Sequence, residues 1–116
     1  MTRSVAREKS YAFALRIVQL SRTLRERREF EIARQILRSG TSIGVNVEEA
    51  QAGTSRPDFV AKMSIASKEA RETRYWLRLL LDSRIGPARE TKEMLVSCEE
   101  LVRILTAIVK TGQAAR

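Results

Sequence analysis

The sequence predicts an all-α protein that folds as an antiparallel up-and-down left-handed four-helix bundle. Its 116 residues include only five glycines and two prolines, whereas Ala, Leu, Arg and Glu, which favour helices, recur throughout. Apolar residues repeat at intervals of three and four along four segments. Short turns between such segments favour antiparallel neighbours, and a repeat of about 3.5 residues favours left-handed packing. The chain length fits a single domain, 1–116.

The first two helices flank a charged corner, RERREF, at 25–30. The first helix is expected over about 4–25, because Ser4 is a suitable N-cap residue. The second is expected over about 29–50. Their expected inward faces are Phe13, Ile17, Leu20 and Leu24 in the first, and Ala33, Ile36, Gly40, Ile43, Val47 and Ala50 in the second.

Turn and capping residues bound the last two helices. Gly53 suits a helix end, and Ser55 with Asp58 resembles a capping box, so the third helix is expected over about 56–83. Gly86 is expected to end that helix and Pro87 to begin the fourth, over about 87–111. The expected inward faces are Phe59, Met63, Ala66, Ala70, Thr73, Leu77 and Leu80, and then Met94, Cys98, Leu101, Leu105 and Ile108.

Two glycines one turn apart, Gly40 and Gly44, interrupt the second helix, where each costs about 1 kcal/mol relative to Ala. Because Ala66 and Ala70 lie on the inward face of the third helix, we expect the glycines to allow a close crossing of the second and third helices. The alternative is a local bend without further meaning.

A second apolar stripe lies on a different face of two helices. Since a lone bundle buries one stripe per helix, the extra stripes are typical of an interaction surface, and we expect a homo-oligomer. The alternative is that chain termini or a more twisted bundle cover them. The expected interface residues are Tyr11, Leu15 and Val18, which continue into Arg22 and Arg25, and Ile65, Glu69, Glu72, Trp76 and Leu79.

Positive charge is concentrated in the first half of the chain. The net charge of the whole is +8, and residues 1–47 hold ten basic against four acidic side chains. Such a balance favours a nucleic-acid partner, and arginine suits phosphate contacts. With few aromatics nearby, binding is expected to be mainly electrostatic. The candidate RNA-binding residues are Arg22, Arg25, Arg27, Arg28, Arg34 and Arg38.

Catalytic patterns are weak in this sequence. It contains no His, which is the commonest general base and metal ligand, so we expect no enzyme, no cofactor and no metal. The carboxylates of Glu48, Glu49, Glu69 and Glu72 are oxygen ligands for a hard cation, but nearby Arg and Lys favour ion pairing. Cys98 is expected to be a core residue without a His partner.

A polar network is expected between the second and third helices. Asn46 and Glu49 lie one turn apart and are expected to face basic, acidic and aromatic residues of the third helix. Such a network would fix the register of the two helices, and the alternative is that these side chains are simply solvated. The predicted members are Asn46, Glu49, Lys68, Glu69 and Tyr75.

Three stretches carry a family resemblance: RSGTSIGVNVEEAQAG (38–53), DFVAKMSIASKEA (58–70) and ETRYWLRLL (72–80). With them, the chain from Tyr11 to Ile108 resembles the small bacterial four helix bundle proteins named after the intervening sequences of 23S ribosomal RNA genes. The resemblance implies a left-handed bundle that assembles as a ring-shaped homopentamer. It also implies kinship with the accessory bundle protein of diversity-generating retroelements, a basic pentamer that engages RNA and a reverse transcriptase.

The resemblance supplies no catalytic residue to carry over. Where the family usually reads Ala-Asn-Ile-Ala-Glu-Ala, this chain has Val-Asn-Val-Glu-Glu-Ala at 45–50. The additional Glu48 places a further negative charge near the predicted network, which puts a family-like surface there in doubt.

The functional hypothesis is therefore a non-enzymatic homo-oligomeric bundle, with a pentamer favoured, that is RNA-associated or a scaffold. One alternative is a protein-only interaction scaffold, and another is a metal-dependent hydrolase built on the Glu cluster. The N-terminal stretch has charges within its apolar part and no cleavage site, and no run of about 18 uncharged residues suits a membrane span. With a single cysteine, these features favour a cytoplasmic protein without membrane association.

Overall fold

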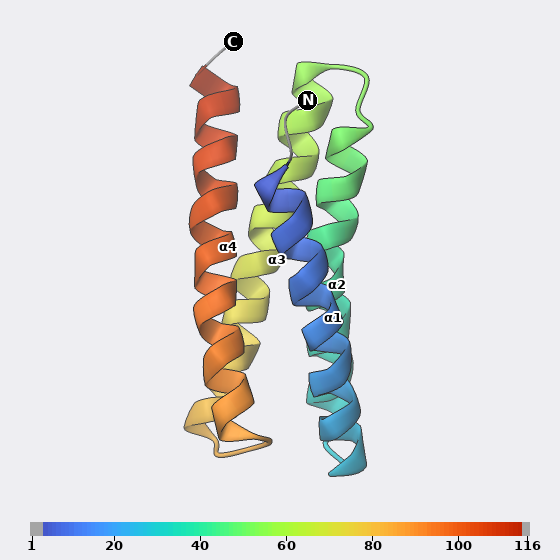
Figure 1. The fold of residues 1–116 in the computed structure, drawn as a ribbon, viewed down its shortest axis with the longest axis vertical. Helices are drawn as coiled ribbons and strands as arrows, with labels where there is room; N and C mark the ends of the chain where they lie inside the picture. The colour runs from blue at the N-terminus through green and yellow to red at the C-terminus, as the bar shows by residue number, and fades with distance from the viewer. Residues whose placement is uncertain (1–3, 115–116) are drawn as a thin grey trace.

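Four α-helices account for most of residues 4–114, the part of the chain that the computed structural model describes. They are α1 (Val5–Glu26), α2 (Phe30–Gln51), α3 (Arg56–Asp82) and α4 (Ala88–Ala114). Successive helices run in opposite directions along an elongated body of 46 × 24 × 21 Å (Figure 1). The predicted all-α four-helix bundle is confirmed, while its left-handed sense stays a prediction. The ends of the predicted domain, 1–3 and 115–116, lie outside the described residues.

The helices pack in chain order. α2 packs against α1 and α3, α3 packs against α4, and the closing contact between α1 and α4 is less extensive than these three. Two ion pairs bridge α1 and α4: Lys9 with Glu100 at 3.1 Å, and Arg16 with Glu93 at 2.9 Å. These ion pairs supplement the less extensive packing between α1 and α4.

The predicted inward faces form the core of the bundle. Ile17, Ile36, Ile43, Leu77 and Leu105 are fully buried, as expected from the repeat of three and four. The ends of the predicted faces are less covered, because Phe59 and Ile108 are only half-buried against the core. A buried hydroxyl pair, Ser39 and Thr73 with oxygens 2.9 Å apart, joins α2 to α3 within this apolar environment.

Capping residues define the starts of two helices as predicted. The Ser4 hydroxyl accepts a hydrogen bond from the Arg7 amide at 3.1 Å, and that of Ser55 accepts from the Asp58 amide at 3.2 Å. Each bond satisfies one of the amides that the first turn leaves without an intrahelical partner. α1 and α3 therefore begin within a residue of the predicted positions.

Arginines, not glycines, occupy the left-handed position after α1 and α3. Arg28 has φ 66° and Arg84 has φ 59°. In each turn the amide of the following residue bonds to a carbonyl of the preceding helix, from Glu29 to the Leu24 carbonyl at 2.8 Å and from Ile85 to the Leu80 carbonyl at 2.9 Å. These are the hydrogen bonds of Schellman motifs. The expectation that Gly86 ends the third helix is therefore wrong, because α3 stops at Asp82 and Arg84 makes the reversal.

The end of α4 also differs from the prediction. The helix continues to Ala114, past the expected end at 111 and through Gly112. A Cβ at Gly112 would lie 2.6 Å from Val60 Cγ2, so the absence of a side chain lets α4 approach α3 there. The glycine is therefore a packing residue inside the helix rather than a terminator.

The close crossing made by the glycines of α2 involves α1, not α3 as predicted. A Cβ on Gly40 would lie 2.7 Å from two side-chain carbons of the fully buried Ile17. A Cβ on Gly44 would lie 3.5 Å from the Ser10 carbonyl oxygen, an ordinary contact. Of these two glycines, only Gly40 is therefore needed to avoid a steric overlap with α1. The heptad repeat located the inward face correctly but did not distinguish which of two neighbouring helices the glycines approach.

Replacing Gly40 with alanine should destabilise the protein. The new methyl group overlaps Ile17, which is β-branched and fully buried, and overpacking of this kind costs about 1–3 kcal/mol. Since alanine improves helix propensity by about 1 kcal/mol, we expect Gly40→Ala to lower the free energy of unfolding by up to about 2 kcal/mol in urea titrations. Gly44→Ala is the matched control and should be neutral or stabilising. A Gly40→Ala protein as stable as Gly44→Ala would contradict this packing.

Replacing Arg84 with glycine should stabilise the protein. A left-handed conformation costs a residue with a Cβ about 1–2 kcal/mol, which exceeds the entropy that glycine adds to the unfolded chain. We expect Arg84→Gly to raise the free energy of unfolding by up to about 1 kcal/mol. The neighbouring Ser83 has φ −85°, so Ser83→Gly should lower stability. Equal effects of the two glycines in urea titrations would show that the backbone conformation is not the cause.

Candidate functional site

The outward face of α1 carries the predicted apolar stripe, and the bundle leaves it exposed. Tyr11 is 64% exposed, Leu15 53% and Val18 37%. The stripe borders a groove of about 270 Å³ between α1 and α2, to which Tyr11, Ala14 and Val45 contribute. Val45 of α2 is itself 53% exposed. Two helices together therefore present apolar groups to solvent beside this groove, which the paired Arg7 and Glu48 also line.

The stripe predicted on α3 is only partly exposed. Ile65 and Leu79 are exposed, whereas Trp76 is half-buried. The Trp76 indole donates a hydrogen bond to Glu72 at 3.0 Å, and its ring meets that of Tyr75 edge-on at 5.4 Å. Trp76 is therefore held by its own chain, and within the predicted stripe the apolar groups left most open are Ile65 and Leu79 at its two ends.

The predicted arginine cluster separates into free and paired side chains. Arg34 pairs with Glu31 at 2.7 Å, and Arg38 lies between Glu69, at 3.4 Å, and Glu72. Arg38 thus links α2 to α3 and, through Glu72, orients Trp76. The other four have no ion pair with any residue of 4–114, and they lie at the end of α1 and in the turn that follows: Arg22, Arg25, Arg27 and Arg28.

Two further features of the surface were not predicted. Phe30 is exposed beside the free arginines at the start of α2, and it offers an aromatic ring for base stacking. On α3, Arg71, Arg74 and Arg78 also have no ion pair within 4–114. Their spacing of three and four places them on one face of the helix. The net charge of the second half of the chain did not indicate this second group of arginines, because carboxylates elsewhere in that half cancel their charge in the sum.

The five residues of the predicted polar network do not form one network. Asn46 donates to the carbonyl of Ser42, within its own helix, at 2.9 Å. Glu49 accepts a hydrogen bond from Lys62 at 2.9 Å, which raises the pKa of Lys62. The other three have separate surroundings, since Glu69 pairs with Arg38, Tyr75 packs against Trp76, and Lys68 is exposed. The polar contacts that join α2 to α3 are the pair Ser39 and Thr73, the Arg38 ion pairs and the pair of Lys62 with Glu49.

The four glutamates considered as metal ligands are all engaged with cations of the chain. Glu48 pairs with Arg7 at 2.7 Å, Glu49 with Lys62, and Glu69 and Glu72 with Arg38. Within residues 4–114, no three carboxylate or thiol groups are arranged to hold a metal ion. Across these residues no helix is long and apolar enough to cross a membrane.

Cys98 lies in the core, as predicted. Its thiol donates to the Ala70 carbonyl at 3.3 Å, and burial raises its pKa to about 12. The thiol consequently stays protonated near neutral pH, and a protonated thiol is a poor nucleophile.

Comparison with known proteins places this fold in a family. No curated protein sequence matches the chain. A crystal structure of a protein of unknown function from the S23 ribosomal protein family of Bacteroides thetaiotaomicron is similar to it, with 44% identity and a TM-score of 0.87 over 91% of this chain and 99% of the other. The family model described as 23S rRNA-intervening sequence protein matches residues 3–107. The chain belongs to the 23S rRNA-intervening sequence protein family.

Proposed function

We propose that this protein is a non-enzymatic, homo-oligomeric helical bundle, with a pentamer favoured, that associates with RNA. The observation that carries the proposal is the outward face of α1. Along it the exposed apolar groups of Tyr11, Leu15 and Val18 continue directly into the unpaired Arg22 and Arg25. A single helix face thus combines a surface suited to burial against another copy with a surface suited to phosphate.

Burial of the apolar part supplies the driving force for association. Transfer of apolar surface from water contributes about 25 cal/mol per Å², and Tyr11 and Leu15 are each more than half exposed in the single chain. Tyrosine is also among the residues enriched at interface hot spots. The adjacent groove beside Val45 offers a receiving surface for apolar side chains of a second copy.

Association of copies through this face would bring their arginine clusters together. Each copy contributes Arg22, Arg25, Arg27 and Arg28, which have no ion pair with a described residue, and with Glu26 and Glu29 in the same corner the net charge there remains positive. Several such clusters on one particle raise the effective concentration of cations around one RNA strand.

Charges placed in the apolar stripe should dissociate the oligomer. We expect the wild-type protein to have a multiple of the single-chain mass by light scattering after size exclusion, and a Tyr11→Glu, Leu15→Glu double variant to have the single-chain mass. The physical reason is that two carboxylates without partners resist removal from water. Val96→Glu, at an exposed apolar position of α4, is the control and should leave the mass unchanged. A double variant with the wild-type mass would rule out this face as the interface.

Removal of two corner charges should weaken RNA binding and flatten its dependence on salt. We expect Arg22→Gln, Arg25→Gln to lower the affinity for a single-stranded RNA at low salt. The slope of log K against log salt should fall by about 1 for each phosphate that is no longer neutralised by an arginine. Fluorescence anisotropy over a range of KCl concentrations measures both quantities.

Lys92→Gln provides the control for charge, since Lys92 is exposed on α4 without an ion pair in the described region. An affinity for RNA that does not depend on salt would contradict the electrostatic contact. If the wild-type protein forms the oligomer but retains no RNA at low salt, the protein-only scaffold replaces the present proposal.

A further inference from the structure

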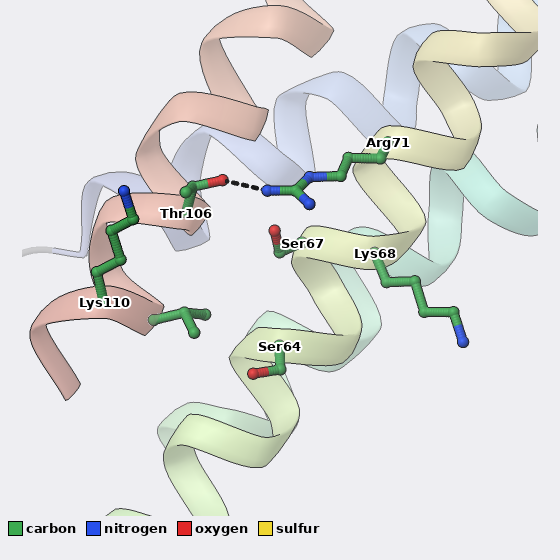
Figure 2. Close-up of a pocket in the computed structure, with 7 residues that line it drawn as sticks. Ser64, Ser67, Lys68, Arg71, Thr106 and Lys110 are labelled. Atoms are coloured by element: carbon green, nitrogen blue, oxygen red, sulfur yellow. Dashed lines mark hydrogen bonds between the residues drawn. The ribbon is translucent and has the colours of Figure 1, made fainter. Parts of the chain in front are cut away.

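A cleft of about 290 Å³ opens between α3 and α4, on elements other than the α1 face and its corner. Figure 2 shows the Arg71 side chain crossing from α3 toward α4, where its Nη2 donates to the Thr106 hydroxyl at 3.1 Å. The hydroxyl of Ser67 points toward this pair, and that of Ser64 points toward α4 (Figure 2). Donor groups from two helices therefore converge on one cavity.

The charge of this cleft is positive and not neutralised. Arg71 and Lys110 line it, and no carboxylate is among its lining residues. Neither Arg71 nor Lys110 has an ion pair with any residue of 4–114. Arg7 of α1, in contrast, pairs with Glu48 of α2. Lys68 lines the cleft with its stem, while its ammonium group points away (Figure 2). An anion is the ligand that these charges favour.

The hydroxyl groups of the cleft are also free to donate. Elsewhere in the bundle, helical threonines give their hydroxyl hydrogen to the carbonyl one turn earlier, as Thr41 and Thr91 do at 2.6 and 2.7 Å. Thr106 instead accepts from Arg71. The hydroxyl groups of Ser64 and Ser67 make no hydrogen bond in the described structure. Ser67 is a buried residue overall, but its hydroxyl oxygen keeps some contact with solvent. Its hydroxyl is therefore open to the cleft.

We propose that the α3–α4 cleft binds a phosphate group. A guanidinium offers two parallel N–H donors that match two phosphate oxygens, and its contact with Thr106 already fixes its position. Ser64, Ser67 and Thr106 supply neutral donors to the remaining oxygens, and Lys110, whose ammonium group points away from the serines in Figure 2, adds positive charge at the rim of the cleft. The volume accommodates a phosphate that is esterified to a larger group. This site is distinct from the arginine corner and holds whether or not that corner binds RNA.

Titration with inorganic phosphate at low ionic strength tests the site directly. We expect the backbone amide and Arg71 Nε–H signals in ¹H–¹⁵N NMR spectra to shift saturably on α3 and α4 around the cleft. Arg71→Gln should weaken phosphate binding about tenfold, because glutamine cannot form the charge-assisted bidentate pair. Ser67→Ala should weaken it about threefold at constant charge. Lys92→Gln, which removes a positive charge elsewhere on α4, should change it less than about twofold.

The variants separate a defined site from a diffuse basic surface. Equal weakening by Lys92→Gln and Arg71→Gln, or no effect of Ser67→Ala, would overturn the proposal, provided that circular dichroism shows each variant to be folded. Two further ligands identify the source of the phosphate. Displacement of inorganic phosphate by a nucleoside monophosphate but not by a short RNA indicates a small ligand. Displacement by the RNA, with the same loss of affinity in Arg71→Gln, indicates a phosphodiester backbone.

Discussion

In a four-helix bundle, each helix has one face that its neighbours can cover, and apolar groups on other faces remain in water. In this protein the covered faces contain fully buried side chains such as Ile17, Ile36, Leu77 and Leu105. Tyr11, Leu15, Val45 and Ile65 have no place there and stay exposed. The close approach of α1 to α2 also determines the rotation of α1 about its axis. Gly40 lets Ile17 approach the backbone of α2, and this contact fixes which side of α1 faces outward.

The distribution of ion pairs is the second determinant of the surface. Five cations form ion pairs with carboxylates of a neighbouring helix: Arg7, Lys9, Arg16, Arg38 and Lys62. Because their charge is neutralised, they join helices and add little to the positive potential around the protein. Among the described cations without an ion pair, four lie at the corner after α1, and Arg71 and Lys110 line the cleft between α3 and α4. Exposed pairs of this kind contribute little to stability individually. Their main consequence here is to determine where unneutralised charge is available to an anionic partner.

The periodicity of the sequence predicted the fold well, because a repeat of three and four depends only on helix geometry and burial. It predicted the helices, their inward faces and the caps at Ser4 and Ser55. It did not predict that Gly40 meets Ile17, since one inward face touches two neighbouring helices. The residue types also did not indicate that Arg28 and Arg84 adopt left-handed conformations. In each turn, this conformation occurs together with the hydrogen bonds of a Schellman motif.

The candidate site was less predictable than the fold because it depends on pairing between distant residues. The sequence located the stripe of Tyr11, Leu15 and Val18 and the free arginines at the corner. It grouped Arg38 with them, although Glu69 and Glu72, more than 30 residues away, hold its guanidinium. The cleft beside Arg71 requires α3 and α4 to be aligned so that Thr106 lies opposite, and no local pattern specifies that alignment.

The claim on which the functional account depends is that the outward face of α1 is buried against another copy of the chain. Sedimentation velocity of the wild-type protein, over a range of concentrations from micromolar to nanomolar, tests it most directly. The account predicts one closed species whose mass is a multiple of the single-chain mass, with five copies favoured. A single-chain mass at every concentration would contradict it.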